Sequence, residues 1–165
     1  MEDHIRFDPT DGVLHLLDQR LLPEQEKDVP CRSLDDVIRA VQGMVVRGAP
    51  AIGVTAAWGC VLALRECEGS NWLTTLGSKL AELSVARPTA VNLRWAVERM
   101  CACLQVAMDR DGPDREALLV AFENEARAIQ REDVEICRAI GHHGGVLLRD
   151  GDTVLTHCNA GALAT

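Results

Sequence analysis

The chain begins with two short apolar runs separated by turn residues, and then changes to a helical spacing. The runs are residues 5–7 and 13–17, and residues 8–12 between them read Asp-Pro-Thr-Asp-Gly. Because those residue types favour tight turns, the pattern predicts a β-hairpin. Residues 22–31, which contain Pro23 and Pro30, are predicted to form a connector.

The region after this connector predicts two helices in succession. Ser33 with Asp36 three residues later has the form of a capping box, and apolar residues then recur three or four apart: Leu34, Val37, Ile38, Val41 and Met44. Residues 47–50 break this helix. Pro50 suits the first turn of a second helix, from Ala51 to about Cys67, which is apolar on nearly every side and is therefore predicted to be buried.

Three further helices are predicted, over residues 70–84, 91–107 and 115–140, with Gly141 as the stop of the last one. The pattern then becomes strand-like at residues 146–148 and 154–158, and residues 159–165 resemble the start of a helix. A strand as apolar as this one needs neighbouring strands on both sides, as in a parallel sheet.

The fold class predicted from these patterns is mainly α. Residues 1–144 form a helical N-terminal domain with a small N-terminal β-hairpin. Residues 145–165 form the first strand and helix of a Rossmann-like α/β domain that is cut off, because no partner strands remain in the sequence.

Composition and charge limit the classes of partner. The formal net charge is −8, which argues against non-specific nucleic-acid binding. The longest apolar stretch, residues 49–64, is too short to span a bilayer, and no basic-then-apolar leader is visible, so we expect a cytoplasmic protein without a membrane partner. The seven cysteines lack metal-site spacing. We expect reduced thiols, six of them packed as small apolar side chains.

Two arginines stand immediately before predicted helices. Arg47 precedes Gly48, Ala49 and Pro50, and Arg87 precedes Pro88. A helix start offers unpaired N–H groups and the positive end of the helix dipole, and an arginine beside it completes a cradle for phosphate. The alternative at each position is an ordinary turn with a solvated arginine. Two such entrances in one acidic domain favour a shared anionic ligand.

Cys158 is the third candidate. It lies at the predicted carboxyl end of a strand and before a helix, which is where open α/β sheets bind ligands. A helix N-terminus favours the thiolate, so Cys158 is a candidate base, acid or nucleophile. The alternative is a buried inert thiol. The adjacent His157 is expected to be structural, because neighbouring side chains of a strand point to opposite faces.

Three segments together resemble the successive signatures of the 5-methylthioribose-1-phosphate isomerases. They are residues 44–53 (MVVRGAPAIG), 87–93 (RPTAVNL) and 155–165 (LTHCNAGALAT). Residues 17–23 (LDQRLLP) and 31–38 (CRSLDDVI) are also similar to that family, in the same order and spacing.

The resemblance implies a two-domain enzyme, usually a homodimer, that interconverts 5-methylthio-α-D-ribose 1-phosphate and 5-methylthio-D-ribulose 1-phosphate in methionine salvage without metal or organic cofactor. Arg47, Gly48, Ala49 and Arg87 match its substrate-binding positions, and Cys158 matches its active-site cysteine. Its catalytic Asp lies in the C-terminal domain, for which this sequence has no residues. The resemblance therefore implies that the isolated 165-residue chain is inactive unless that domain is supplied, for example as a separate chain.

Two relatives with other functions give the alternative interpretations. Ribose-1,5-bisphosphate isomerases are similar around residues 156–158, but the full 159–165 run and residues 47–53 favour the methylthioribose enzyme. The non-catalytic alpha-type subunits of the guanine-nucleotide exchange factor for translation initiation bind partners instead. The presence of Cys158 within a full motif speaks against that interpretation.

Overall fold

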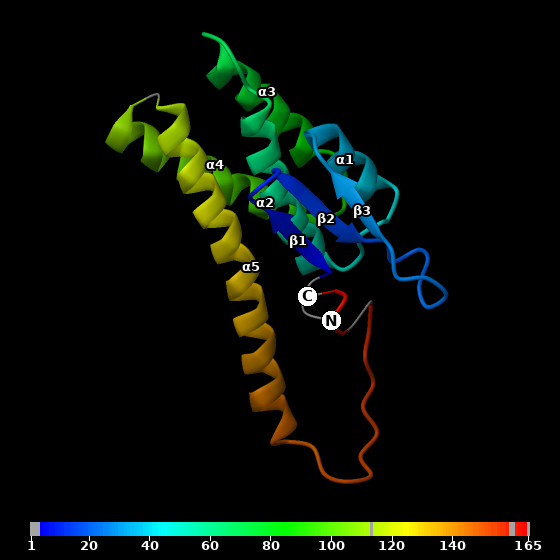
Figure 1. The fold of residues 1–165 in the computed structure, drawn as a ribbon. Helices are drawn as coiled ribbons and strands as arrows, with labels where there is room; N and C mark the ends of the chain where they lie inside the picture. Colours follow the sequence, from blue (N-terminus) through cyan, green and yellow to red (C-terminus); the bar gives the residue numbers. More distant parts are fainter. Residues whose placement is uncertain (1–3, 113, 159–160, 165) are drawn as a thin grey trace.

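The structure is a computed structural model that describes residues 4–112, 114–158 and 161–164. These described residues form a small sheet followed by five helices, and the chain then returns towards its own start (Figure 1). The strands are β1 Ile5–Asp8, β2 Val13–Leu17 and β3 Asp28–Cys31, and the helices are α1 Leu34–Gln42, α2 Ala49–Arg65, α3 Trp72–Ser84, α4 Val91–Asp111 and α5 Arg115–Gly145.

The predicted hairpin is confirmed, and a third strand joins it. β1 pairs antiparallel with β2, with Ile5 opposite Leu16. β3 pairs antiparallel with the other edge of β2, so the sheet order is β1-β2-β3. The prediction of a plain connector at residues 22–31 is therefore wrong over its last four residues. β3 is an edge strand that contains Pro30, and such a strand has a weak sequence pattern because proline cannot donate to the ladder.

The predicted start of α1 is confirmed in detail. The Ser33 hydroxyl accepts a hydrogen bond from the backbone N–H of Asp36 at 3.1 Å. In return, the Asp36 carboxylate accepts from the backbone N–H of Ser33 at 3.0 Å. This reciprocal pair satisfies two N–H groups that the helix itself leaves unpaired.

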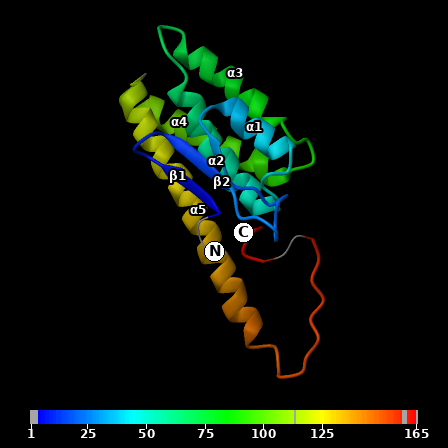
Figure 2. The ribbon, with the colours of Figure 1, turned by 45° about the vertical axis from the view of Figure 1, so that its right-hand side comes forward.

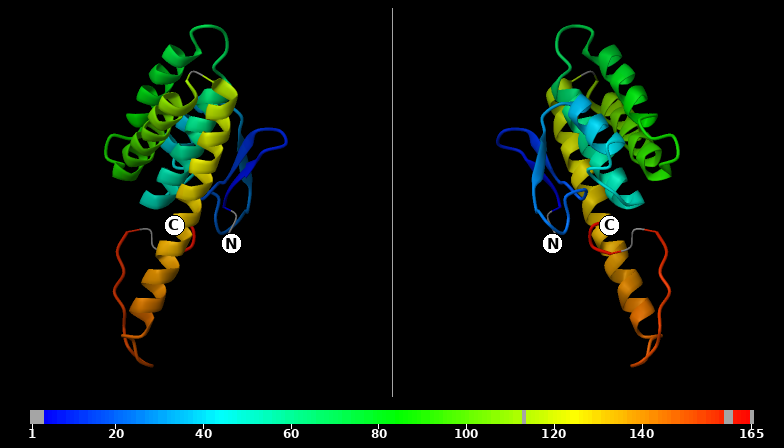
Figure 3. Two further views of the ribbon diagram at one scale, coloured as in Figure 1. Left: turned by 90° about the vertical axis from the view of Figure 1, so that its left-hand side faces the viewer. Right: turned by 90° about the vertical axis from the view of Figure 1, so that its right-hand side faces the viewer.

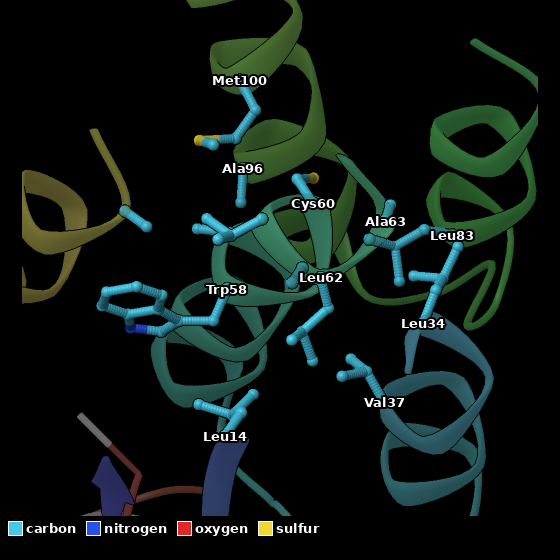
Figure 4. Close-up of a cluster of buried hydrophobic side chains, with 14 of the residues drawn as sticks. Leu14, Leu34, Val37, Trp58, Cys60, Leu62, Ala63, Leu83, Ala96 and Met100 are labelled. Carbon is cyan, nitrogen blue, oxygen red and sulfur yellow. The ribbon is translucent and has the colours of Figure 1, made fainter. Parts of the chain in front are cut away.

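Helix α2 is the centre of the fold. It contacts α1, α3, α4, α5 and β1, and its residues from Ala51 to Leu64 are buried, as its all-round apolar pattern predicts. Figure 4 shows Trp58, Cys60 and Leu62 of α2 among side chains from the sheet and the other helices. The sheet covers one side of α2 and α5, and α3 and α4 lie on the other side (Figure 3).

Helix α5 is longer than the sequence predicts. The prediction that Gly141 ends the helix is wrong, since α5 continues to Gly145. One glycine inside a helix costs about 1 kcal/mol relative to alanine and need not end it. Arg99 of α4 binds Glu125 and Glu132 of α5, so two ion pairs hold these helices together.

The last twenty residues do not contain the predicted strands. Residues 146–158 form neither strand nor helix, and the apolar side chains of Val146, Leu147 and Leu155 are exposed. A single strand cannot satisfy its own backbone N–H and C=O groups, and no partner strand lies beside it within the described residues. The predicted helix start falls partly on residues 159–160 and 165, which lie outside the described residues.

The C-terminal segment nevertheless returns to the helical domain. The chain leaves α5 beyond the other helices and runs back to the start of α2 and β1 (Figure 1, Figure 2). Residues 161–164 lie there in a turn, with Ala164 buried. In the described part of the chain, no helix is both long enough and apolar enough to cross a membrane.

Candidate active site

A pocket of about 580 Å³ at the start of α2 is lined by all five candidate residues: Arg47, Gly48, Ala49, Arg87 and Cys158. They come from three segments far apart in the sequence, namely the loop before α2, the loop after α3 and the C-terminal segment. The structure therefore brings together the residues that sequence analysis selected separately.

The first wall of the pocket is the entrance of α2. Gly48 is the N-cap residue, with φ at 101°, and no side chain of the described residues caps the helix. Pro50 has no N–H, and the N–H of Ala51 donates to the carbonyl of Ala164 at 3.1 Å. The N–H groups of Gly48 and Ala49 bond to no residue that the structure describes, and they lie at the positive end of the helix dipole.

The second feature is a pair of arginines without carboxylate partners. Arg47 is exposed and Arg87 is half-buried. Within the described residues neither arginine forms an ion pair. Other arginines of the chain do pair with carboxylates, among them Arg6, Arg20, Arg39, Arg65, Arg99 and Arg127. Thr89 also lines the pocket but does not cap α4, whose N-cap is Ala90. Two uncompensated guanidinium groups beside free N–H groups give the pocket a local positive potential in an acidic protein.

Cys158 enters the pocket from the C-terminal segment. Its side chain is exposed, so the alternative of a buried thiol is wrong in this structure. Its φ is +64°, a left-handed conformation that is uncommon for a residue with a side chain and marks a turn or a functional site. The predicted placement at a strand end is not seen, because the strand does not form. His157 is exposed too, which does not fit the expected structural role.

The remaining lining is largely apolar, and sequence reasoning did not select it. Met44, Ile52 and Val91 face the pocket. Met44 combines a φ of +58° with a half-exposed side chain, although both features are unfavourable for a methionine. These residues lie within the segments at 44–53 and 87–93, so their position there was the signal that could have identified them.

A larger cavity of about 720 Å³ lies between the sheet, α2 and α5, and it includes none of the five candidate residues. We place the candidate site in the smaller pocket, because it combines two arginines that form no ion pair with any described residue, the N–H groups at the α2 entrance and the exposed thiol of Cys158. The described residues contain no group of three or more His, Cys, Asp or Glu arranged to hold a metal ion.

The other cysteines only partly follow the sequence prediction. Cys31, Cys60 and Cys67 are buried, and burial raises the pKa of the Cys31 thiol to about 11. Cys103 and Cys137 are half-buried. Cys101 of α4 is exposed, so the prediction that six thiols pack inside is wrong for this one.

An ion pair lies behind the loop that carries Arg47. The buried carboxylate of Asp18 accepts hydrogen bonds from Arg20 Nε at 2.7 Å and Nη2 at 2.6 Å. The side-chain hydrogen bonds from Arg20 hold the pKa of Asp18 below its usual value of 3.8. A carboxylate whose pKa is lowered by folding stabilises the folded state above its unfolded pKa, and loses that contribution as the pH falls through the folded pKa.

We therefore expect Asp18→Asn to lower the free energy of unfolding at pH 7, by an amount that shrinks as the pH falls below 3.8 towards and through the lowered pKa of the folded carboxylate. Urea unfolding of both proteins at pH 7 and at about pH 2.5 measures this difference. A gap between the two proteins that stays equal at both pH values would contradict the assignment.

The chain belongs to the Initiation factor 2 subunit family, because its residues 45–165 match that family. The relatives named methylthioribose-1-phosphate isomerase include one from Nitratidesulfovibrio vulgaris (strain DSM 19637 / Miyazaki F), 55% identical over 100% of this chain and 47% of its own length. Another, from Thermotoga petrophila, is 50% identical over 92% of this chain and 43% of its own length.

Two solved structures are similar to the whole chain. The 5-methylthioribose 1-phosphate isomerase from Pyrococcus horikoshii OT3 superposes with a TM-score of 0.85 at 32% identity, over 100% of this chain and 46% of that one. The translation initiation factor eIF-2B subunit delta from A. fulgidus superposes with a TM-score of 0.78 at 39% identity, over 98% and 46%. The chain thus spans about half the length of the relatives it matches.

Proposed function

We propose that this chain provides the phosphate-binding part of an isomerase that converts 5-methylthio-α-D-ribose 1-phosphate into 5-methylthio-D-ribulose 1-phosphate. The observation that carries the proposal is the convergence of Arg47, Arg87 and Cys158 with the α2 entrance in one pocket. Two relatives named methylthioribose-1-phosphate isomerase, which are 55% and 50% identical to this chain, support the proposal.

The phosphate is proposed to bind at the α2 entrance. The N–H groups of Gly48 and Ala49 donate to its oxygens, and Arg47 and Arg87 neutralise its charge. Charge-assisted hydrogen bonds from guanidinium groups and N–H groups at a helix start suit a phosphate dianion. The apolar side chains of Met44, Ile52 and Val91 then face the rest of the sugar.

Cys158 is proposed to act at the reacting carbons. The 1-phosphate blocks the aldehyde of the sugar, so the ring opens with the phosphate still attached, and hydrogen then moves from C2 to C1. The reaction is an internal redox exchange, so no external oxidant or reductant enters. A group that acts on this hydrogen must lie within hydrogen-bond reach of it, and Cys158 is the thiol that faces the pocket.

The second half of the relatives' length is proposed to complete the enzyme. Residues 145–165 then form the first strand and helix of a Rossmann-like domain, because the exposed apolar side chains of residues 146–155 gain partner strands. That domain is proposed to supply the catalytic carboxylate, so the isolated chain is expected to be inactive. The complete protein is proposed to be a cytoplasmic homodimer.

A regulatory subunit of the translation-initiation exchange factor is the second candidate. Its basis is the similarity to the eIF-2B delta subunit, which is as broad as the similarity to the isomerase structure. The two functions differ in ligand: the isomerase requires binding of a methylthio sugar phosphate, and the regulatory subunit requires a protein partner. Binding of a protein partner by the completed protein, without any binding of the sugar phosphate, would favour the second candidate.

The proposal is tested by binding. We expect Arg47→Ala to weaken the binding of 5-methylthioribose 1-phosphate to this chain by about tenfold or more, since one charge-assisted hydrogen bond contributes about 1.5–3 kcal/mol. Isothermal titration calorimetry measures the affinity. Arg32→Ala, which removes an exposed arginine that does not line the pocket, is the matched control.

Unchanged affinity in Arg47→Ala would contradict the phosphate site. Competition with ribose 1,5-bisphosphate in the same titration separates the two isomerase classes, because the methylthio sugar should bind more tightly if the apolar wall receives its methylthio group. Turnover is measured with a hybrid protein, in which Thr165 is joined to the second half of the Nitratidesulfovibrio vulgaris relative.

A further inference from the structure

Residues Asp18, Gln19 and Arg20 follow β2 and hold the loop that carries Arg47. The Arg20 Nη1 atom donates to the carbonyl of Gly43 at 3.4 Å. The backbone N–H of Gln19 donates to the carbonyl of Val45 at 3.0 Å, so the loop is fixed at two successive points. The bidentate pair with Asp18 fixes the Arg20 side chain in turn.

The side chain of Gln19 adds contacts to the Arg47 loop and to the C-terminal segment. Its Nε2 atom donates to the carbonyl of Leu163 at 2.8 Å and, at 3.5 Å, to the carbonyl of Arg47. Leu163 belongs to the same C-terminal segment as Cys158. A glutamine amide has two N–H donors, so one side chain can serve both carbonyls at once. Since Gln19 is only 9% exposed, water does not readily replace these bonds.

The segment that Gln19 holds lies directly on the α2 entrance. The carbonyl of Ala164, next to Leu163, accepts from the N–H of Ala51, and Ala164 itself is buried. Gln19 thus connects two segments that are distant in the chain and that contribute Arg47 and Cys158 to the pocket.

We infer that Gln19 is a positioning residue, which sets the placement of the Cys158 segment relative to the Arg47 loop. The meaning of that placement for catalysis rests on the proposed function, but the placement itself does not. The inference predicts a specific chemistry at position 19. A glutamate of almost the same shape presents oxygens to two carbonyl oxygens and donates to neither, so it should separate the two segments.

The first test uses the wild-type chain and nuclear magnetic resonance. We expect the side-chain amide protons of Gln19 to exchange with solvent at least tenfold more slowly than those of Gln25, which is exposed. Equal exchange rates for the two side chains would overturn the inference without any need for a variant to fold.

The second test compares Gln19→Glu and Gln19→Leu with Gln130→Leu. Gln130 is a matched control, because its side chain also makes two hydrogen bonds, to Ile5 and Trp58, but these bonds involve neither the Arg47 loop nor the C-terminal segment. In both Gln19 variants, exchange of the Ala51 backbone N–H should become at least tenfold faster. In Gln130→Leu it should stay within about twofold of the wild type, even if the urea midpoint falls equally.

The hybrid protein gives the catalytic measurement. Gln19→Glu should lower kcat at least tenfold while it changes the KM by less than about threefold, because the phosphate contacts remain and the thiol is displaced. Unchanged exchange at Ala51 in the Gln19 variants, or an equal change in Gln130→Leu, would overturn the inference. Faster exchange at Ala51 together with absent sugar-phosphate binding would instead retain the positioning role and contradict the proposed function.

Discussion

Replacement of Cys158 by serine is expected to lower the turnover of 5-methylthioribose 1-phosphate by the hybrid protein about 10²–10⁴-fold, the range that a positioned acid or base contributes. The reason is chemical: a serine hydroxyl has nearly the same shape but ionises far less readily than a thiol. Affinity for the sugar phosphate should change by less than about threefold, because Arg47, Arg87 and the N–H groups at the α2 entrance remain.

Proton magnetic resonance of the sugar follows this reaction directly. Cys101→Ser is the matched control, since Cys101 is also exposed but does not line the pocket. That variant should retain wild-type turnover. Normal turnover by Cys158→Ser would remove the thiol from the mechanism and leave the pocket as a binding site only.

Replacement of Gly48 by alanine is expected to have the second largest effect. A Cβ atom there would lie 2.4 Å from the Cα and 2.6 Å from the carbonyl oxygen of Ala164, which is closer than atoms can approach. The φ of 101° adds a backbone cost of about 1–2 kcal/mol for any residue with a side chain. Both effects should displace the C-terminal segment and break the hydrogen bond from Ala51 to Ala164.

Gly69→Ala separates the two effects. Gly69 also has a positive φ, of 74°, but nothing lies within 4 Å of the added Cβ. It should lower the free energy of unfolding by about 1–2 kcal/mol without any change at the pocket. Gly48→Ala should lose more in urea unfolding and should also bind 5-methylthioribose 1-phosphate at least tenfold more weakly. Equal effects of the two variants in both measurements would contradict the close approach of Ala164.

The sequence predicts the elements that local interactions determine. The hairpin at residues 5–17 follows from its turn residues, and the start of α1 follows from Ser33 and Asp36, which bond to each other. β3 was not predictable in this way, because an edge strand with Pro30 depends on β2 for its partners. The continuation of α5 beyond Gly141 was not predictable either, because the low helix propensity of one glycine does not decide where a helix ends.

The C-terminal segment marks the limit of local reasoning. The apolar residues 146–148 and 154–158 have a strand-like pattern, yet a strand exists only with a partner, and the described residues offer none there. Whether this segment pairs is therefore decided by residues outside the segment itself.

The candidate site residues were selected from separate local signals, and the structure places them around one pocket. Arg47 and Arg87 each precede a helix, and these two helix entrances lie at the same end of the domain as Cys158, so their separate signals converge. Gln19 was missed, because a glutamine that bonds to two distant carbonyls has no signature in its neighbouring residues. Met44 was predicted as part of a helix face, but it lies after α1 and faces the pocket.

The most direct test of the proposed function is to follow 5-methylthioribose 1-phosphate, labelled with carbon-13 at C2, in the presence of the hybrid protein. The proposal predicts a ketone carbon signal that grows with time. It also predicts that neither this chain alone nor the relative's second half alone produces the signal. A folded hybrid protein that binds the labelled sugar and leaves it unchanged would contradict the assignment as an isomerase.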